Sequence, residues 1–266
     1  MSRPGSIVVG KRRLETEWWG PRPQAAPTLV LLHEGLGCVA LWRDFPDNLA
    51  AATGFGVFAF SRFGYGRSEP VSLPRPLSYM HDEARDVLPR VLDAAGIERC
   101  VLVGHSDGAS IAAIHAASAR DARVCGLALI APHFFVEDVT VASIAAIRAA
   151  YDTGDLRRRL ARYHTRVDVA FRGWSEAWLN PGFRGWDITP LVPAIEAPML
   201  LLQGSEDRYG TTDQLRVAER AARSPVRTVL LQGAEHSPHI EAPRPTADEV
   251  ARFARSVLQH ELYCHS

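Results

Sequence analysis

The sequence CVLVGHSDGAS at residues 100–110 joins an apolar run to a segment of small residues through the motif Gly-x-Ser-x-Gly. The run is typical of a buried strand, and residues 106–119 are typical of a helix packed under a sheet. Gly104 and Gly108 leave room for a tight strand-to-helix turn, which would hold Ser106 at the carboxyl edge of the sheet. A serine that only caps the helix is the structural alternative. The stretch therefore predicts an α/β sheet with a candidate nucleophile at its edge.

Short apolar runs alternate along the chain with longer amphipathic segments. The expected parallel strands cover residues 28–33, 57–61, 100–104, 126–131, 199–203 and 227–231, after an antiparallel hairpin at 7–9 and 14–19. The expected helices of this alternating part cover residues 79–95, 106–119, 213–223 and 246–260. Continuous apolar runs suit parallel strands that are covered on both faces. The pattern predicts an α/β fold with a doubly wound, mostly parallel sheet.

One segment, residues 134–197, interrupts this alternation because it contains no clear strand. Its helical stretches are expected at residues 139–152, 155–163 and 167–179. Such an insertion predicts a helical cap between two parts of an α/β core, residues 1–133 and 198–266. Most aromatic side chains of the cap are expected to pack it against the core, whereas Trp174 and Trp178 are candidates for lining a substrate pocket.

The composition of the 266-residue chain narrows the classes of partner. Its 30 basic and 30 acidic residues balance, which gives no argument for binding nucleic acid or an anionic membrane. No apolar run approaches a membrane span, and the N-terminus lacks a signal-peptide pattern. The cysteines show neither metal-binding nor disulfide spacing: Cys38, Cys100, Cys125 and Cys264. A cytoplasmic protein without membrane contact is expected.

Two later loops carry groups that could activate a serine hydroxyl. A hydroxyl becomes a good nucleophile when a histidine, itself oriented by a carboxylate, removes its proton. Asp207 and His236 each follow one of the late expected strands, so both should reach the sheet edge near Ser106. Glu206 is the alternative acid. A metal site at His236 and His239 lacks a third ligand at a useful spacing, and none is predicted.

These segments resemble the α/β-hydrolase superfamily over nearly the whole chain. The matching pieces are LLHEGLG at 31–37, SRFGYGRS at 61–68, GHSDG at 104–108, GSED at 204–207 and GAEHSPHIE at 233–241. The resemblance implies an eight-stranded sheet with a helical cap, and it requires neither a metal nor an organic cofactor. It also implies Ser106 as nucleophile, Asp207 as acid and His236 as base.

The same resemblance implies an oxyanion hole on the loop after the third strand. Relatives usually carry His-Gly-x there, whereas this chain has His33-Glu34-Gly35. Matching by position assigns one donor N–H to Gly35, and the N–H of Leu36 is the alternative donor. Leu36 is also a candidate for contacting the substrate. The second donor is the N–H of Asp107, whose carboxylate would oppose an oxyanion if it faced the hole. That side chain is expected to support the start of its helix, with a substrate contact as the alternative.

Arginine side chains give two further hypotheses. Arg62 is expected either in a structural salt bridge or at the edge of the site. Six cap arginines indicate an anionic substrate or, alternatively, solvated helix faces: Arg157, Arg158, Arg159, Arg162, Arg166 and Arg172.

The resemblance implies a serine hydrolase that cleaves a small ester, thioester or lactone through an acyl-enzyme. C–C hydrolysis of ring-fission products is a neighbouring alternative. Hydroxynitrile lyase or cofactor-free oxygenase chemistry, and a binding protein that keeps the triad, are alternatives from other classes. A small molecule is the expected partner, and relatives that form dimers through cap or edge-strand contacts leave a homodimer open.

Overall fold

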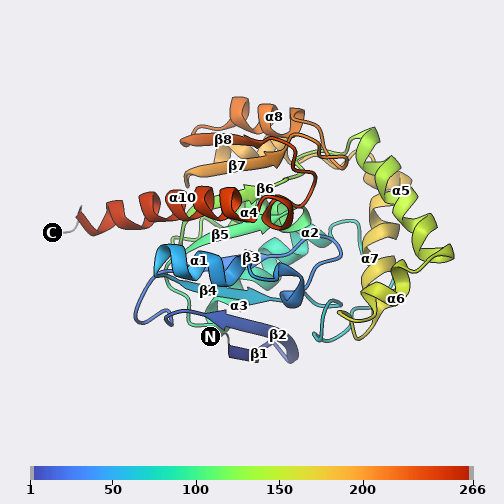
Figure 1. The fold of residues 1–266 in the computed structure, drawn as a ribbon, viewed down its shortest axis with the longest axis horizontal. Helices are drawn as coiled ribbons and strands as arrows, with labels where there is room; N and C mark the ends of the chain where they lie inside the picture. Colours follow the sequence, from blue (N-terminus) through green and yellow to red (C-terminus); the bar gives the residue numbers. More distant parts are fainter. Residues whose placement is uncertain (1–2, 264–266) are drawn as a thin grey trace.

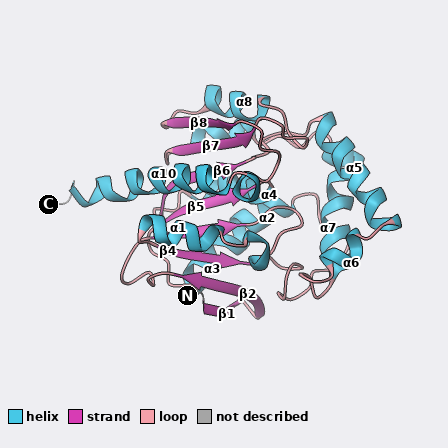
Figure 2. Ribbon diagram, viewed as in Figure 1, coloured by secondary structure: helices cyan, strands magenta, loops and turns pink. Residues whose placement is uncertain are grey.

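Eight strands form one sheet in the computed structural model, which describes residues 3–263. The strands are β1 Arg3–Val9, β2 Arg12–Trp19, β3 Thr28–Leu32, β4 Gly56–Phe60, β5 Cys100–His105, β6 Val124–Ile130, β7 Met199–Gly204 and β8 Val226–Leu231. Their order is β1-β2-β4-β3-β5-β6-β7-β8 (Figure 2). Strand β2 pairs antiparallel with β1 and β4, and the remaining pairs are parallel. The predicted α/β fold with a mostly parallel, eight-stranded sheet is confirmed.

Helices cover both faces of this sheet (Figure 1). The helices are α1 Phe45–Thr53, α2 Tyr79–Asp82, α3 Leu88–Ala94, α4 Asp107–Ala119, α5 Asp138–Thr153, α6 Leu156–Leu160, α7 Val167–Leu179, α8 Asp213–Ala221, α9 Pro238–Glu241 and α10 Pro243–Tyr263. Helices α1 and α10 contact each other over one face, while α4 packs on β5 and β6 from the other. The sequence does not predict α1, because this short segment carries no long apolar stripe.

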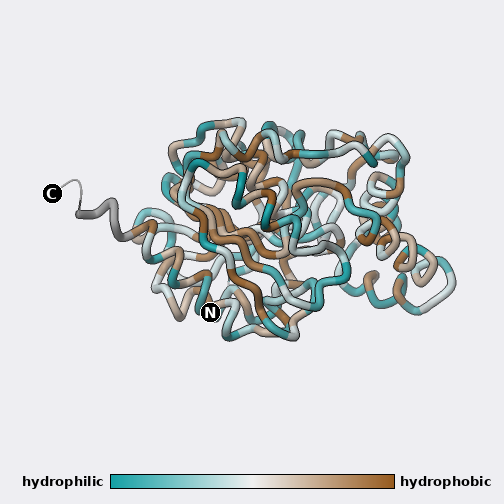
Figure 3. The backbone as a smooth tube through the Cα atoms, turned by 90° about the horizontal axis from the view of Figure 1, so that it is seen from above, coloured by the Kyte–Doolittle hydropathy of each residue, from teal (hydrophilic) through white to brown (hydrophobic). Residues whose placement is uncertain are grey.

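Alternating side chains of the central strands bury both faces of the sheet. Leu29 and Leu31 belong to the apolar cluster under α1 and α10, whereas Val30 and Leu32 belong to the cluster under α4. This period of two explains why the strands appear in the sequence as unbroken apolar runs. The hydrophobic central strands are visible as the brown band in Figure 3. The two-sided core fixes the strand register and thereby the height at which each following loop starts.

The segment between β6 and β7 carries α5, α6 and α7, which lie together beyond one end of the strands (Figure 1). Helix α7 has the predicted bounds, whereas α6 is shorter than the predicted residues 155–163. The division into a cap at 134–197 and a core stays a prediction. Within residues 3–263, none of the helices combines the length and apolar character that a bilayer span requires.

Candidate active site

Ser106 lies at the turn between β5 and α4, in a backbone conformation that few serines adopt. Its φ of 52° and ψ of −118° belong to a region that costs a non-glycine residue about 1–3 kcal/mol. Neither neighbouring glycine could carry a side chain. A Cβ on Gly104 would lie 2.4 Å from the Gly108 oxygen, and a Cβ on Gly108 would lie 2.0 Å from the Leu32 oxygen. The turn therefore holds Ser106 at the carboxyl end of β5.

The structure brings the three predicted side chains into one hydrogen-bonded series. The Nε2 atom of His236 lies 3.0 Å from Ser106 Oγ, and its Nδ1 atom lies 2.9 Å from Asp207 Oδ1. Asp207 also accepts hydrogen bonds from the Tyr209 N–H at 2.8 Å and from Gln203 Nε2 at 3.1 Å. Burial, the largest single influence, raises the pKa of Asp207, but the hydrogen bond and charge of His236 together with the Tyr209 N–H outweigh it and lower this pKa to about 2. The carboxylate is therefore ionised at neutral pH and can orient the imidazole.

This shifted pKa predicts how stability depends on pH. The pKa of Asp207 is about 2 in the folded protein against an ordinary 3.8, so folding favours its ionised form. Its contribution is present above the ordinary value and is lost as the pH falls through the folded value. We expect the difference in unfolding free energy between wild type and Asp207→Asn to shrink by roughly 2 kcal/mol between about pH 5 and about pH 2. Urea unfolding across this range measures the difference, and a constant difference would contradict the prediction.

Glu206 and His239 lie outside this series. Glu206 is exposed, and within the described part of the chain its carboxylate accepts one side-chain hydrogen bond, at 3.4 Å from the neighbouring Ser205. His239 is buried against the rings of Trp42 and His105, and burial lowers its pKa to about 3. Among residues 3–263, no group of three or more His, Cys, Asp or Glu side chains is arranged to hold a metal ion. The remaining cysteine, at position 264, lies outside the described residues.

The loop after β3 holds one peptide group in a fixed orientation. The Glu34 carbonyl accepts hydrogen bonds from Arg62 Nη2 at 2.9 Å and His33 Nδ1 at 2.7 Å, and His33 Nε2 accepts the Arg62 N–H at 2.9 Å. Since the peptide is trans, the N–H of Gly35 points in the opposite direction to this carbonyl. Among the described residues, neither this N–H nor that of Asp107 has a hydrogen-bond acceptor. Both groups remain available to a ligand.

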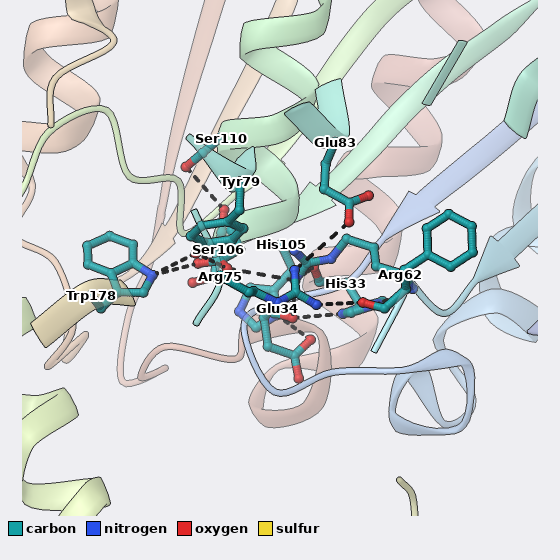
Figure 4. Close-up of polar contacts among 12 residues, drawn as sticks. His33, Glu34, Arg62, Arg75, Tyr79, Glu83, His105, Ser106, Ser110 and Trp178 are labelled. Carbon is teal, nitrogen blue, oxygen red and sulfur yellow. Dashed lines mark hydrogen bonds and ion pairs between the residues drawn. The ribbon is translucent and has the colours of Figure 1, made fainter. Parts of the chain in front are cut away.

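The carboxylate of Asp107, in the first turn of α4, is buried in the protein. It accepts hydrogen bonds from Tyr79 Oη at 2.6 Å and Trp178 Nε1 at 3.1 Å, and Arg62 Nη2 lies 3.7 Å away. Figure 4 shows Trp178, Tyr79 and Arg62 converging on this region. Asp107 lies in the first turn of α4, as expected, and its carboxylate in addition joins α7 to the body of the protein. The structural salt bridge expected for Arg62 is present.

The side chain of Glu34, the residue that replaces the usual glycine, is partly buried and points toward His105. Its Oε2 atom lies 3.4 Å from His105 Nδ1, and a Cβ on Gly37 would lie 2.3 Å from the same oxygen. His105 is buried, and its Nε2 contacts the His236 carbonyl at 2.8 Å. Burial lowers the pKa of His105, but the hydrogen bond and charge of Glu34, together with the His236 carbonyl and the charge of Asp207, outweigh burial and raise this pKa. The substitution thus links the loop after β3 to the segment that carries His236.

A cavity of about 230 Å³ opens above Ser106. The three residues predicted to contact substrate, Leu36, Trp174 and Trp178, all line it. Sequence reasoning missed several further lining residues, among them Ile144, Ile147, His133 and Tyr209. His133 could have been predicted as a lining residue from the sequence, because it follows the carboxyl end of β6, just as Ser106 follows the carboxyl end of β5. Burial lowers its pKa to about 3, so the ring is neutral at physiological pH.

The cap arginines lie on the outer surface instead of in this cavity. Arg157 pairs with Asp168 at 2.6 Å, and Arg172 lies 3.7 Å from Asp152. None of the six arginines is among the described residues that line the cavity. They give no support for an anionic substrate, and the alternative of solvated helix faces fits their positions.

An α/β sheet with a hydrogen-bonded serine, histidine and aspartate at its carboxyl edge is the arrangement of α/β hydrolases. Residues 29–249 match the alpha/beta hydrolase family, and the chain belongs to this family. The RutD protein of Variovorax paradoxus, to which carbamate hydrolysis is ascribed, is 30% identical over 86% of this chain and 90% of its own. The human (lyso)-N-acylphosphatidylethanolamine lipase is 25% identical over 90% of this chain and 81% of its own.

Solved structures show the same fold. The 2-hydroxy-6-oxo-6-phenylhexa-2,4-dienoate hydrolase of Rhodococcus sp. strain RHA1 superposes with a TM-score of 0.78 at 18% identity. This match covers 95% of the present chain and 98% of the other. With its family membership and its hydrolase relatives, the protein is an enzyme of the hydrolase class.

Proposed function

We propose that the protein is a serine hydrolase that cleaves a small ester, thioester or lactone through Ser106, His236 and Asp207. The observation that carries this proposal is the contact of His236 with both partners, 3.0 Å to Ser106 Oγ and 2.9 Å to the Asp207 carboxylate. With Nδ1 protonated and held by the carboxylate, Nε2 can accept the serine proton. The strained turn adds support, because it presents Ser106 to the cavity instead of to the helix end.

In the proposed reaction, Ser106 Oγ bonds to the carbonyl carbon while His236 Nε2 takes the hydroxyl proton. The N–H groups of Gly35 and Asp107 donate to the resulting oxyanion, and one such donor is commonly worth about 3–4 kcal/mol. The intermediate collapses, the bond to the leaving group breaks, and His236 returns the proton to that group. A water molecule, deprotonated by His236, then attacks the acyl-enzyme and releases the acid with free Ser106.

The cavity favours a compact acyl group. Its volume is about 230 Å³, which is below the range of about 300–1,000 Å³ that is typical of sites for drug-sized ligands. The wall includes six aliphatic and aromatic residues, Leu36, Ile144, Ile147, Trp174, Trp178 and Tyr209, and three glutamates, Glu34, Glu235 and Glu241. A carbamate is the second candidate substrate, favoured by the similarity to RutD, and it would be attacked at the same carbonyl carbon.

Labelling with a fluorophosphonate probe, followed by intact mass, tests the proposal on wild type, Ser106→Ala and His236→Ala. We expect one adduct on wild type and none on either variant, because only an activated serine reacts quickly. Esters, lactones, thioesters and carbamates of rising acyl length then define the substrate. No adduct on folded wild type would argue against an activated serine and favour the lyase, oxygenase or binding alternatives.

A further inference from the structure

Trp174 lies directly on the loop that carries the proposed oxyanion donor. This α7 side chain is 7% exposed and lines the cavity above Ser106. A Cβ on Gly35 would lie 2.0 Å from Trp174 Nε1 and 2.4 Å from its Cδ1. The nitrogen-bearing edge of the indole therefore occupies the space where any other residue at position 35 would place its side chain. The contact explains why this position is glycine.

The indole N–H of Trp174 has no hydrogen-bond acceptor among residues 3–263. The indole ring itself packs edge-on against the ring of Phe171. Other tryptophans of the chain differ. The N–H of Trp178 donates to Tyr79 and Asp107, and the unpartnered indole nitrogens of Trp42 and Trp186 are fully enclosed. The nitrogen of Trp174 is not enclosed in this way, although the residue is almost buried. A donor left open only toward the cavity is suited to a ligand atom.

We propose that Trp174 Nε1–H donates to the acyl oxygen of the substrate as negative charge develops on it. This role rests on the proposed function, because the oxygen becomes an oxyanion only when Ser106 attacks. Trp174 would be a third donor, beside the N–H groups of Gly35 and Asp107. The first two donors belong to the core, whereas Trp174 belongs to the helical insertion. The placement of α7 over the sheet edge would then contribute directly to catalysis. Esters, thioesters and carbamates would all accept this hydrogen bond, because each has a carbonyl oxygen that becomes an oxyanion.

The test replaces the N–H without changing the shape of the ring. Benzothienylalanine at position 174 keeps the bicyclic side chain but has sulfur in place of N–H, and Trp174→Phe removes the N–H together with part of the ring. The same benzothienyl replacement at Trp186 is the matched control, because this tryptophan lies in the same insertion, is not among the residues that line the cavity, and has an enclosed indole nitrogen. For each protein we would measure kcat, KM, Tm and the inhibition constant of an alkyl boronic acid that forms a tetrahedral adduct with Ser106.

We expect the benzothienyl variant at 174 to lose kcat by about tenfold to a hundredfold, with KM changed by about twofold or less. The inhibition constant of the boronic acid should rise by a similar factor, because its tetrahedral adduct mimics the charged intermediate. The control at position 186 should leave kcat of the folded protein nearly unchanged, because this residue does not line the cavity.

Three results would overturn the donor role while leaving the serine hydrolase intact. One is a benzothienyl variant with wild-type kcat. Another is a loss confined to Trp174→Phe, which would assign the residue to packing against Gly35. The third is a raised KM at constant kcat, which would indicate a contact made equally in the ground state. If Ser106→Ala instead retains wild-type turnover, the proposed function and the donor role fail together.

Discussion

Replacing Ser106 with alanine is expected to reduce kcat for any accepted ester by about five to six orders of magnitude. The variant loses the atom that bonds to the carbonyl carbon, while the cavity and the N–H donors remain. The residual rate should come from those donors and from substrate positioning, as a water molecule replaces the serine oxygen. Initial rates with p-nitrophenyl esters, measured against a buffer blank, determine the loss.

Ser110→Ala is the matched control for this experiment. Ser110 lies one turn further along α4, and its hydroxyl donates to the His133 carbonyl at 2.6 Å instead of facing the cavity. This control should keep kcat within about tenfold, since it breaks one buried hydrogen bond of the supporting structure. The double variant Ser106→Ala with His236→Ala should be no slower than the single serine variant, because the two groups act as a unit. A Ser106→Ala protein with more than about a hundredth of wild-type kcat would contradict a serine nucleophile.

The sheet and the placement of Ser106, Asp207 and His236 could be predicted because local rules determine them. Parallel strands covered on both faces must be apolar at every position, so they appear as continuous runs in the sequence. The loops after these runs meet at one edge of the sheet, so residues far apart in the chain converge without any knowledge of packing. The same rule applied to the end of β6 would also have placed His133.

Other features of the site depend on contacts that no local pattern encodes. The Asp107 carboxylate bonds to Tyr79, 28 residues away, and to Trp178, 71 residues away. The position of Trp178 depends on how α7 packs over the sheet, and the amphipathic pattern of that helix does not specify which residue it meets. The role of Glu34 could not be predicted either. Its partner His105 lies at the end of β5, whereas Glu34 follows β3, and no local pattern joins the two residues.

Arg62→Met is expected to lower the free energy of unfolding by about 3–5 kcal/mol, because it breaks a buried ion pair from one side. The Arg62 side chain is 1% exposed, and its Nη2 lies 2.9 Å from the Glu34 carbonyl and 3.7 Å from the Asp107 carboxylate. It also lies over the ring of Tyr65, 4.8 Å from the ring centre. Methionine fills part of the space but leaves the Asp107 carboxylate without its cationic partner. Urea unfolding at neutral pH measures the loss.

The same substitution should also reduce kcat of the folded enzyme by about tenfold or more, because one guanidinium steadies both proposed oxyanion donors. It holds the Glu34–Gly35 peptide through the carbonyl, and it faces the side chain of Asp107, whose N–H is the second donor. Arg62→Lys should be intermediate, since it keeps the charge but loses the planar fork. If Arg62→Met folds poorly, this variant provides the kinetic measurement.

Arg75→Met separates the two effects of Arg62. Arg75 is also buried and lies 4.0 Å from the Glu83 carboxylate, but it bonds to the Phe63 carbonyl instead of the loop after β3. Its replacement should therefore destabilise the protein while the folded fraction keeps nearly full kcat. Equal losses of kcat in the two methionine variants would mean that both act through general stability, and that Arg62 does not position the oxyanion donors. A loss confined to the Arg62 variants would instead identify the guanidinium as the group that joins the core loop to the start of α4.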